Sequence, residues 1–308
     1  MAPITAIIDK SSSDDSVIKL FYATGKAQLG LALWSGTKDA DPQDPIQTPQ
    51  EVGNGQYILN PSQMASVNSQ GVERVFALTT DNPFKVTPSD FYSLSEISES
   101  NQKQLLDVSI GNTTLAACGN GEDGWVYYSS NMGNGRTLNE LNLQTSRSTQ
   151  LTWTHDLWIN SFAAAWYDTT NNRRCVIYEG SFLVDYVVDS GSRKHLIPIS
   201  KTCAHSLEAG TPIQSTGDMQ RNTPVAVAFD NDKVFLYYCG RGAAGGIRRT
   251  IRTNNSWGTS TPVDSRIISQ DSQLTVVRAN GINHLFFVAR DQNEEEDDYF
   301  VHYQDEIN

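Results

Sequence analysis

Basic residues and long apolar runs are scarce in this chain of 308 residues. Lysine and arginine number 23 against 35 acidic residues, which gives a formal net charge of -12 at pH 7. A surface of that charge repels nucleic acid and anionic lipid, so the composition excludes both as principal partners. No apolar run is long enough to span a membrane, and the start of the chain lacks the basic and apolar regions of a secretion signal. We therefore expect a cytoplasmic protein that does not bind membranes.

Cysteine is also rare. The four cysteines, Cys118, Cys175, Cys203 and Cys239, are too far apart for a metal-binding motif, and three of them lie in apolar stretches. Because free cysteine packs as a small hydrophobic residue, we expect reduced, buried side chains. Neither a Ser-His-Asp array nor a cluster of metal ligands can be recognised from spacing, so the sequence predicts no metal site and no cofactor.

Helical periodicity is missing as well. Short apolar runs alternate with segments rich in Gly, Ser, Thr, Asn and Asp, and no long stretch places apolar residues at helical spacing. The pattern predicts an all-β protein. Only one polar break suggests a domain boundary, so we expect a single domain over residues 1–308.

A segment of small apolar residues recurs six times. Each copy is followed by a more aromatic segment, such as GWVYYS or KVFLYY, and after a turn by a third apolar segment, such as QLGLALW. The spacing between copies runs from 47 residues, between Ala116 and Ala163, to 63 residues, between Ala163 and Ala226. The six copies align on Ala6, Ala65, Ala116, Ala163, Ala226 and Thr275.

Repeats of this length in an all-β sequence predict a six-bladed β-propeller with mostly four-stranded blades. Small side chains suit the innermost strands, which crowd around the axis, while aromatic side chains fill the space between blades. The first and last repeats lie at the two ends of the chain, so the ring should close by contact between the first and last blades. A β-sandwich with accidental internal similarity is the alternative.

The strand pattern resembles the six-bladed fungal fucose-binding lectins. It combines a small-residue strand, an aromatic second strand, and a third strand such as IRRTIR that is followed by Trp257 and Gly258. The resemblance implies a sugar site between blades, built from an arginine of the second strand, a glutamate of the third strand and an aromatic ring. Charged groups of this kind hold ring hydroxyls, while the aromatic ring covers the C–H face of the sugar.

No unit of the sequence carries both polar anchors of that pattern. In unit order, the residues at the arginine and glutamate positions are Lys19 and Gly30; Arg74 with no clear glutamate; Trp125 and Glu140; Arg174, one place out of register, and Asp185; Phe235 and Arg249; and His284 and His302. A sugar site that has lost one hydrogen-bonding partner is weakened by about 1 to 3 kcal/mol per bond. The divergence of the six units indicates one asymmetric pocket instead of six equivalent sugar sites.

Two function classes follow from the resemblance. Among fungal proteins similar to these lectins are the hetero-Diels–Alderases of tropolone-sesquiterpenoid biosynthesis, which join a quinone-methide heterodiene to a terpene alkene. The resemblance thus implies a cofactor-independent cycloaddition of a small apolar or aromatic substrate, catalysed by orientation and by a hydrogen-bond donor. The alternative is a fucose-type lectin with degenerate sites that binds a monosaccharide, and Arg74 and Glu140 keep that interpretation open.

Candidate site residues can be named for the enzyme. The predicted catalytic donors are Arg278, Lys233 and His284. The predicted substrate-binding residues are Trp125, Trp153, Trp158, Trp166, Glu140 and Arg249. The sequence leaves open whether the pocket lies in the axial channel or between blades.

Overall fold

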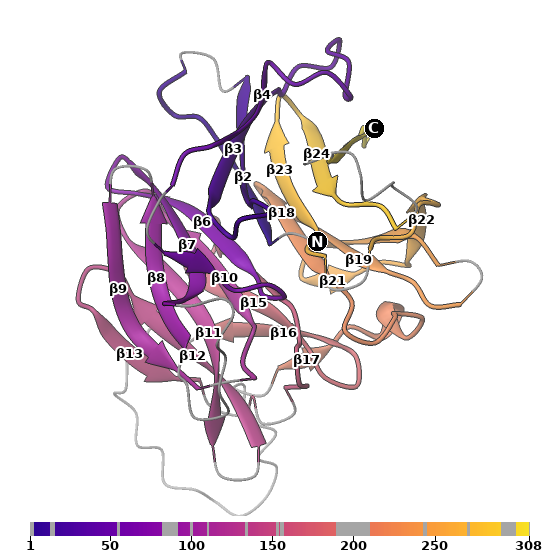
Figure 1. Ribbon diagram of the computed structural model, residues 1–308. Coiled ribbons are helices and arrows are strands. Elements are labelled where there is room, and N and C mark those ends of the chain that lie inside the picture. Colours follow the sequence, from indigo (N-terminus) through magenta and orange to yellow (C-terminus); the bar gives the residue numbers. More distant parts are fainter. Residues whose placement is uncertain are drawn as a thin grey trace, which may run out of the picture.

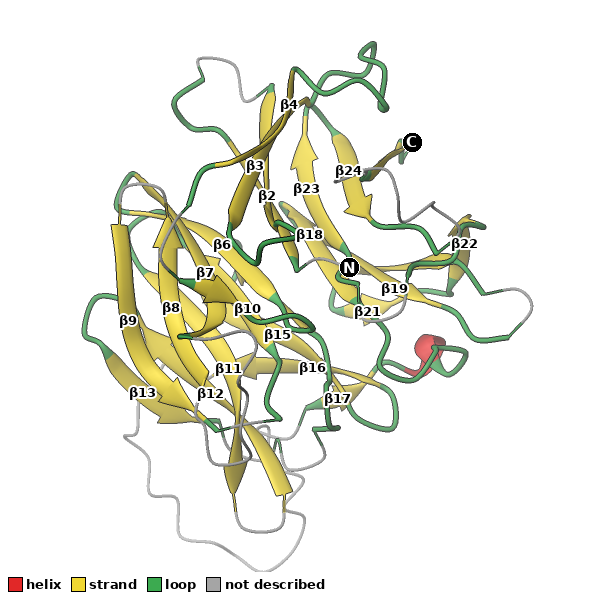
Figure 2. Ribbon diagram, viewed as in Figure 1, coloured by secondary structure: helices red, strands yellow, loops and turns green. Residues whose placement is uncertain are grey.

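Six antiparallel sheets stand around a common axis in the computed structural model (Figure 1). The structure describes residues 3–12, 16–53, 56–81, 92–98, 101–109, 111–132, 135–151, 154, 157–188, 210–242, 245–269, 272–290 and 300–307. Within these ranges the chain is almost entirely strand and loop, and the one helix is the short 3-10 turn η1 (Gln214–Thr216) (Figure 2). No helix of the described ranges has the length and apolar character needed to cross a membrane.

Each sheet is one blade, numbered here in chain order. Blade 1 consists of β1 (Ile4–Ile8), β2 (Val17–Ala23), β3 (Leu29–Ser35) and β4 (Gln47–Glu51). Blade 2 consists of β6 (Met64–Ser69), β7 (Val72–Thr80), β8 (Tyr92–Ser98) and β9 (Asn101–Val108), with the short β5 (Tyr57–Ile58) paired to β7. Blade 3 consists of β10 (Leu115–Gly119), β11 (Gly124–Met132), β12 (Gly135–Asn142) and β13 (Arg147–Gln150).

The second half of the ring repeats this plan. Blade 4 consists of β14 (Ala163–Asp168), β15 (Arg173–Glu179), β16 (Leu183–Val188) and β17 (Thr211–Pro212). Blade 5 consists of β18 (Val225–Asp230), β19 (Lys233–Cys239), β20 (Ile247–Thr253) and β21 (Ser256–Trp257), with β22 (Thr261–Asp264) also paired to β20. In blade 6 the described strands are β23 (Thr275–Ala279), β24 (Ile282–Phe287) and β25 (Val301–Asp305).

The prediction of a six-bladed propeller is therefore confirmed. All six small-residue segments form the inner strands β1, β6, β10, β14, β18 and β23, and each contacts the inner strand of the next blade. The ring closes where β1 of the first blade contacts β23 of the last blade. Closure matters because it gives every blade a neighbour on both faces.

Tight turns set the register between inner and second strands. Gln70 and Gly71 join β6 to β7, and Asn280 and Gly281 join β23 to β24, all four with positive φ angles between 48° and 80°. Two consecutive positive φ angles define the hairpin turn whose twist matches that of paired strands, and asparagine and glycine adopt it most readily. The same hairpins place one face of each second strand against the following blade.

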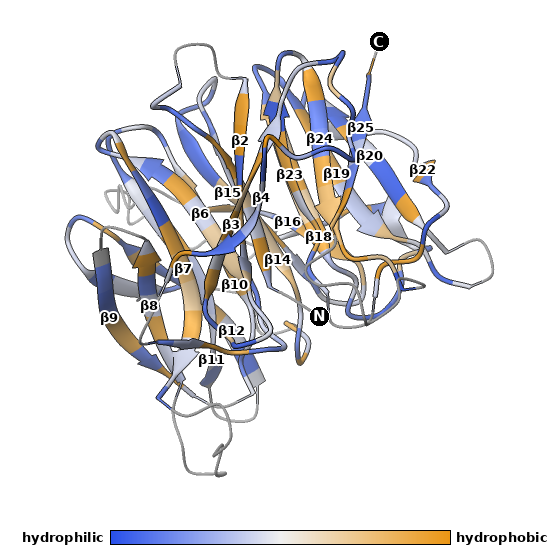
Figure 3. Cartoon of the chain, turned by 45° about the horizontal axis from the view of Figure 1, so that its top comes forward, coloured by the Kyte–Doolittle hydropathy of each residue, from blue (hydrophilic) through white to orange (hydrophobic). Residues whose placement is uncertain are grey.

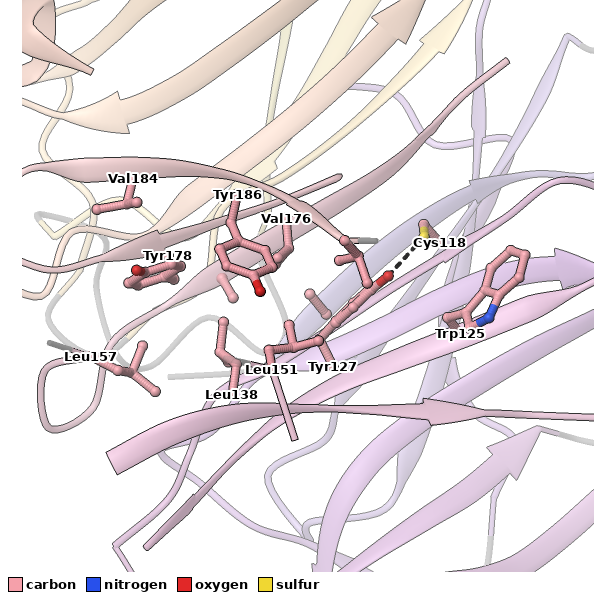
Figure 4. Close-up of a cluster of buried hydrophobic side chains, with 13 residues drawn as sticks. Cys118, Trp125, Tyr127, Leu138, Leu151, Leu157, Val176, Tyr178, Val184 and Tyr186 are labelled. Atoms are coloured by element: carbon pink, nitrogen blue, oxygen red, sulfur yellow. Dashed lines mark hydrogen bonds between the residues drawn. The ribbon is translucent and has the colours of Figure 1, made fainter. Parts of the chain in front are cut away.

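The hydrophobic core is divided into six layers, one between each pair of neighbouring blades. Apolar residues accordingly lie along the strands that face one another across the blade interfaces (Figure 3). In the layer between blades 3 and 4, Tyr127, Tyr178 and Tyr186 pack among leucine and valine side chains (Figure 4). Aromatic rings supply the large area that such wide layers require.

The cysteine prediction is confirmed for three of the four residues. Cys118, Cys175 and Cys239 are free and buried, and burial raises the pKa of each thiol to about 12. Thiols in this state are neutral packing groups at physiological pH. Cys203 lies outside the described residues.

Candidate functional site

The axial channel has a volume of about 200 Å³ and is lined by the six inner strands or the residues that lead into them. Its described lining includes Ala6, Ala65, Ala116, Ala164 and Ala226, and no ionisable side chain. Small residues leave this space open because larger side chains from six converging strands would collide at the axis. Among its described residues the channel therefore offers no charged donor to a substrate.

Two glutamines tie the inner strands together where they begin. The Gln63 side chain accepts from the backbone N–H of Leu115 and Ala163 at 3.1 and 2.9 Å, and donates to the Ala163 carbonyl at 3.0 Å. Gln273 makes the same three contacts to Ile4 and to Met64. Each side chain thus satisfies backbone groups of the next two blades, a structural role at this end of the channel.

The strand register identifies the positions that correspond to the sugar anchors of the fucose-binding lectins. On blades 1 to 5 the residue opposite the second residue of the inner strand faces the following blade, and on blade 6 this place is taken by Phe286, opposite Thr275, the first residue of β23. Each of these second-strand residues pairs in turn with one third-strand residue. These third-strand residues are Leu31, Glu96, Glu140, Asp185, Arg249 and His302. The second-strand anchor positions, two residues earlier on the second strand, hold Lys19, Arg74, Trp125, Cys175, Phe235 and His284.

Two sequence assignments are corrected by this register, and a third is confirmed. The third-strand position of blade 1 is Leu31, because Gly30 instead lies opposite Tyr22, whose ring fills the space that a Cβ atom would need. The second-strand position of blade 4 is Cys175, which confirms that Arg174 lies one place out of register. The second correction concerns blade 2.

Blade 2 carries both polar anchors, contrary to the expectation that no unit does. The guanidinium of Arg74 donates two hydrogen bonds to Glu96, from Nε to Oε1 at 2.9 Å and from Nη2 to Oε2 at 2.5 Å. Glu96 is almost fully buried, and the guanidinium carbon of Arg74 lies 5.5 Å from the centroid of the Phe76 ring. Such a bidentate pair is rigid, and here it uses two of the five N–H donors of Arg74 within its own blade.

In three other blades the third-strand anchor forms an ion pair with the following blade. Glu140 accepts from Arg174 at 2.7 Å. Asp185 accepts from Arg252 at 2.8 Å, and Arg249 donates to Asp305 at 2.7 Å. These pairs occupy the inter-blade space that the lectin resemblance assigns to a sugar, so we interpret them as contacts that hold neighbouring blades together.

The seam between blades 6 and 1 contains a buried histidine pair. His284 and His302 lie 2.9 Å apart through Nδ1 and Nε2, and His302 stacks on Phe286 and meets the edge of Trp34. Burial lowers the pKa of His284 to about 4 and that of His302 to about 3, with the neighbouring His284 adding to the effect on His302. Both imidazoles are therefore neutral at pH 7.

The cleft between blades 1 and 2, called here the 1/2 cleft, contains a cavity of about 410 Å³. It is lined by Lys10, Ser11, Lys19, Phe21, Gly71, Val72, Glu73, Val75 and Ser98. A volume of this size suits a small organic molecule. The cleft lies beside the second-strand anchor Lys19, but its third-strand anchor is the apolar Leu31, so it lacks the carboxylate of a sugar clamp.

Lys19 is held as a cation in this cleft. Its Nζ lies 2.7 Å from Glu73 and 3.1 Å from Asp9. Burial by itself lowers the pKa of Lys19, but the hydrogen bonds to Glu73 and Asp9 outweigh it and raise the pKa above its usual value. An ammonium group has three N–H donors, so one is left to bind an acceptor atom of a ligand.

The predicted catalytic residues lie at different places in the ring. Arg278 pairs with Asp230 of blade 5 at 2.8 Å and lies over the Phe235 ring. Lys233 begins β19 opposite Asp230 and is exposed, so it is near Arg278. His284 is fully buried in the seam between blades 6 and 1, and the structure does not bring it together with the other two.

The predicted substrate-binding residues are also dispersed. Trp125 stacks on Tyr167 between blades 3 and 4, where Glu140 also lies, whereas Trp166 lies beneath Arg252 between blades 4 and 5. Trp158 lies beneath Arg221, Arg249 lies between blades 5 and 6, and Trp153 is outside the described residues. The sequence did not identify Glu96 as the third-strand anchor of blade 2. Of the residues that line the 1/2 cleft, it identified Lys19 but not Phe21 or Glu73.

Glu179 is a buried carboxyl group at the end of β15. Its Oε1 accepts from the backbone N–H of Asn222 at 2.7 Å. Burial raises its pKa to about 7, against the opposite effects of the backbone N–H groups of Asn222 and Thr223 and of the Arg221 charge. Its proton is therefore held in the folded state over a pH range in which an exposed glutamate has already lost it.

Replacement of this carboxyl, Glu179→Gln, should remove a pH dependence of stability. The unfolded chain releases the proton near pH 4.5 and the folded chain near pH 7, so the free energy of unfolding falls as the pH rises between them, by roughly 3 kcal/mol. Urea unfolding at pH 5 and pH 8 measures the change. We expect the variant to gain stability relative to the wild type at pH 8 only, and an equal difference at both pH values would contradict the assignment.

Comparison with known proteins agrees with the fold and leaves the function open. No protein-family model matches the sequence, and no curated protein matches it. AofleA from Arthrobotrys oligospora is similar in structure, with a TM-score of 0.62 and 12% identity over 99% of this chain and 86% of that chain. The Aleuria aurantia lectin in complex with Fucalpha1-6GlcNAc has a TM-score of 0.59 and 14% identity over 94% of this chain and 88% of that chain.

A bacterial lectin is similar as well. BP39L from Burkholderia pseudomallei has a TM-score of 0.50 and 14% identity over 94% of this chain and 82% of that chain. At such identities the likeness establishes a shared architecture and no shared activity. The chain is thus a six-bladed propeller that resembles the fucose lectins in fold.

Proposed function

We propose that this protein is a cofactor-independent hetero-Diels–Alderase that joins a quinone-methide-type heterodiene to a terpene alkene in the 1/2 cleft. The observation that carries the proposal is a cavity of about 410 Å³ that is lined by the Lys19 ammonium. The third-strand anchor position beside it holds the apolar Leu31 instead of a carboxylate. A sugar site needs acceptors for ring hydroxyls, whereas a carbonyl-bearing apolar substrate needs one donor and apolar walls.

The residues of the cleft have separate roles in this reaction. Phe21, Val72 and Val75 form the apolar walls that hold the heterodiene and the alkene in contact, and positioning of this kind supplies up to about 7 to 11 kcal/mol. Lys19 donates a hydrogen bond to the carbonyl oxygen of the heterodiene, where negative charge increases as the bonds form. Glu73 and Asp9 keep the ammonium charged and fixed.

The reaction needs no other participant. One C–C and one C–O bond form as three π bonds become one, and no atom leaves. The donors predicted from sequence, Arg278, Lys233 and His284, lie at other interfaces and stay predictions for the same chemistry. The three buried free thiols accord with a cytoplasmic location.

The test is a cycloaddition assay with purified protein, an ortho-quinone methide generated in place and a humulene-type alkene. We expect wild-type protein to accelerate the reaction and to give one stereoisomer, and Lys19→Met to lose about 100-fold in rate, the usual effect of removing one such donor. Lys26→Met, which changes an exposed turn lysine, is the matched control. Racemic product at the uncatalysed rate with wild-type protein would refute the proposal.

Binding of one monosaccharide is the second candidate function, favoured by the Arg74–Glu96 pair beside Phe76. The relevant measurement is calorimetric titration with L-fucose. Saturable binding that disappears in Arg74→Gln would support this function. Absence of binding by wild-type protein would remove it.

A further inference from the structure

A second polar pocket lies between blades 5 and 6, at the end of the ring where the inner strands begin. Its volume is about 260 Å³, and it is lined by residues that precede β18, residues that precede β23, and Arg290 after β24, together with Cys239 of β19 and Phe162 before β14. The 1/2 cleft shares no lining residue with it. A ligand of this pocket is therefore independent of the function proposed for the cleft.

The charged residues that line the pocket are opposite in sign to the net charge of the chain. Two of its lining residues, Arg221 and Arg290, are cationic, and no described lining residue is a carboxylate. The chain as a whole carries a formal charge of -12. Two guanidinium groups at one cavity, without a carboxylate among its described walls, form a site that attracts an anion and offers it several N–H donors.

Local contacts hold the Arg221 side chain and the Arg290 backbone in place. The guanidinium carbon of Arg221 lies 4.9 Å from the centroid of the Trp158 ring, a cation–π contact that covers one face and leaves the N–H edges available. The backbone N–H of Arg290 donates to Ile267 at 2.8 Å, and the N–H of Ser269 donates to Val288 at 2.8 Å. These bonds fix the segment after β24 against the segment before β23, so the two sides of the pocket are preorganised.

Neutral polar groups complete the lining. The side chains of Gln220, Asn222, Ser269 and Ser272 line the pocket with the arginines. Asn222 adopts a positive φ of 52°, and its backbone N–H is fixed by Glu179. Amide and hydroxyl groups donate to anions without adding negative charge.

We propose that this pocket binds a small molecule that carries an oxyanion, with Arg221 and Arg290 as its two charged donors. A planar carboxylate and a tetrahedral phosphate each present a pair of oxygen atoms that paired N–H donors recognise. The ligand bound here differs in chemistry from the uncharged substrate proposed for the 1/2 cleft.

The test is calorimetric titration of the full chain with inorganic phosphate and, separately, with citrate, at constant ionic strength. We expect saturable binding of at least one of the two, weakened at least tenfold by Arg221→Gln and by Arg290→Gln. Arg147→Gln, which changes an exposed arginine of blade 3, should bind as the wild type does. Both pocket arginines are exposed, so these variants should fold, and circular dichroism checks that they do.

The outcomes separate the ligand classes. Binding of phosphate alone assigns a phosphate site, and binding of citrate alone assigns a carboxylate site. Binding of neither probe by wild-type protein, or binding that both pocket variants retain, would overturn the proposal. The cycloaddition assay of the Lys19→Met variant is unaffected by either result, so the two proposals fail separately.

Discussion

Lowering the pH from 6 to 5 should weaken the seam between blades 6 and 1 through His284 and His302. Both pKa values are depressed by burial, to about 4 and about 3, from an ordinary value of 6.5. The unfolded chain therefore binds protons below pH 6.5 that the folded chain does not bind until pH 4 or lower. The contribution of the two neutral histidines to the free energy of unfolding is fully present above pH 6.5 and is lost as the pH falls. Between pH 6 and pH 5 the pair loses on the order of 2 kcal/mol of this contribution.

The measurement is urea unfolding of wild type and of the double variant His284→Gln/His302→Gln at pH 8, 6 and 5. We expect the wild type to lose more stability than the double variant between pH 6 and pH 5, whatever their difference at pH 8. Glu179 changes stability with the opposite sign over this pH range, but it is present in both proteins, so its effect cancels in the comparison. Parallel curves for the two proteins would show that the histidines do not titrate as their burial implies.

Removal of the Glu140 carboxylate should destabilise the protein by about 3 to 5 kcal/mol, the usual cost of breaking a buried ion pair. Glu140 is 8% exposed and accepts hydrogen bonds from Arg174 of blade 4 at 2.7 Å and from Tyr127 at 2.9 Å. In Glu140→Ala the Arg174 cation stays between the blades without that partner, beside the ring of Trp125. Chemical denaturation at pH 7 measures the loss.

Two further variants test whether the loss of stability comes from breaking the ion pair. Arg174→Met in the Glu140→Ala background should recover part of the stability, because it removes a cation that has lost the Glu140 carboxylate. Glu306→Ala breaks the exposed pair with Lys38 and should cost far less stability, because an exposed ion pair is screened by solvent. If Glu140→Ala costs no more than Glu306→Ala, the ion pair does not hold the blades together, and the predicted substrate-binding role of Glu140 regains weight.

Much of the architecture could be predicted because it depends on local pattern. Small residues recur where strands crowd the axis, and aromatic residues recur where blades face one another, so segments such as Ala163–Asp168 and Lys233–Cys239 were assigned to the correct strands. The side-chain period of two in a strand makes such assignments robust. Glu96 was missed because the segment before β8, residues 82–91, separates it from Arg74 by an unusual spacing.

The contacts between blades could not be predicted in the same way. Arg174, Arg252 and Asp305 are 34, 67 and 56 residues from the partners they neutralise. A single sequence shows charged residues on each strand but not which strand of the next blade they face. The cavity of the 1/2 cleft depends likewise on how closely two blades approach one another.

The amino-acid sequence by itself determined the all-β class, the six units and the closure of the ring, because these follow from alternation and repeat length along one chain. Only the tertiary structure decided which polar side chains pair with one another, which cleft stays open and which residues line it. The physical reason is that charge pairing and cavities depend on distances of a few ångströms between separate blades, and those distances are set by the packing of all six layers together.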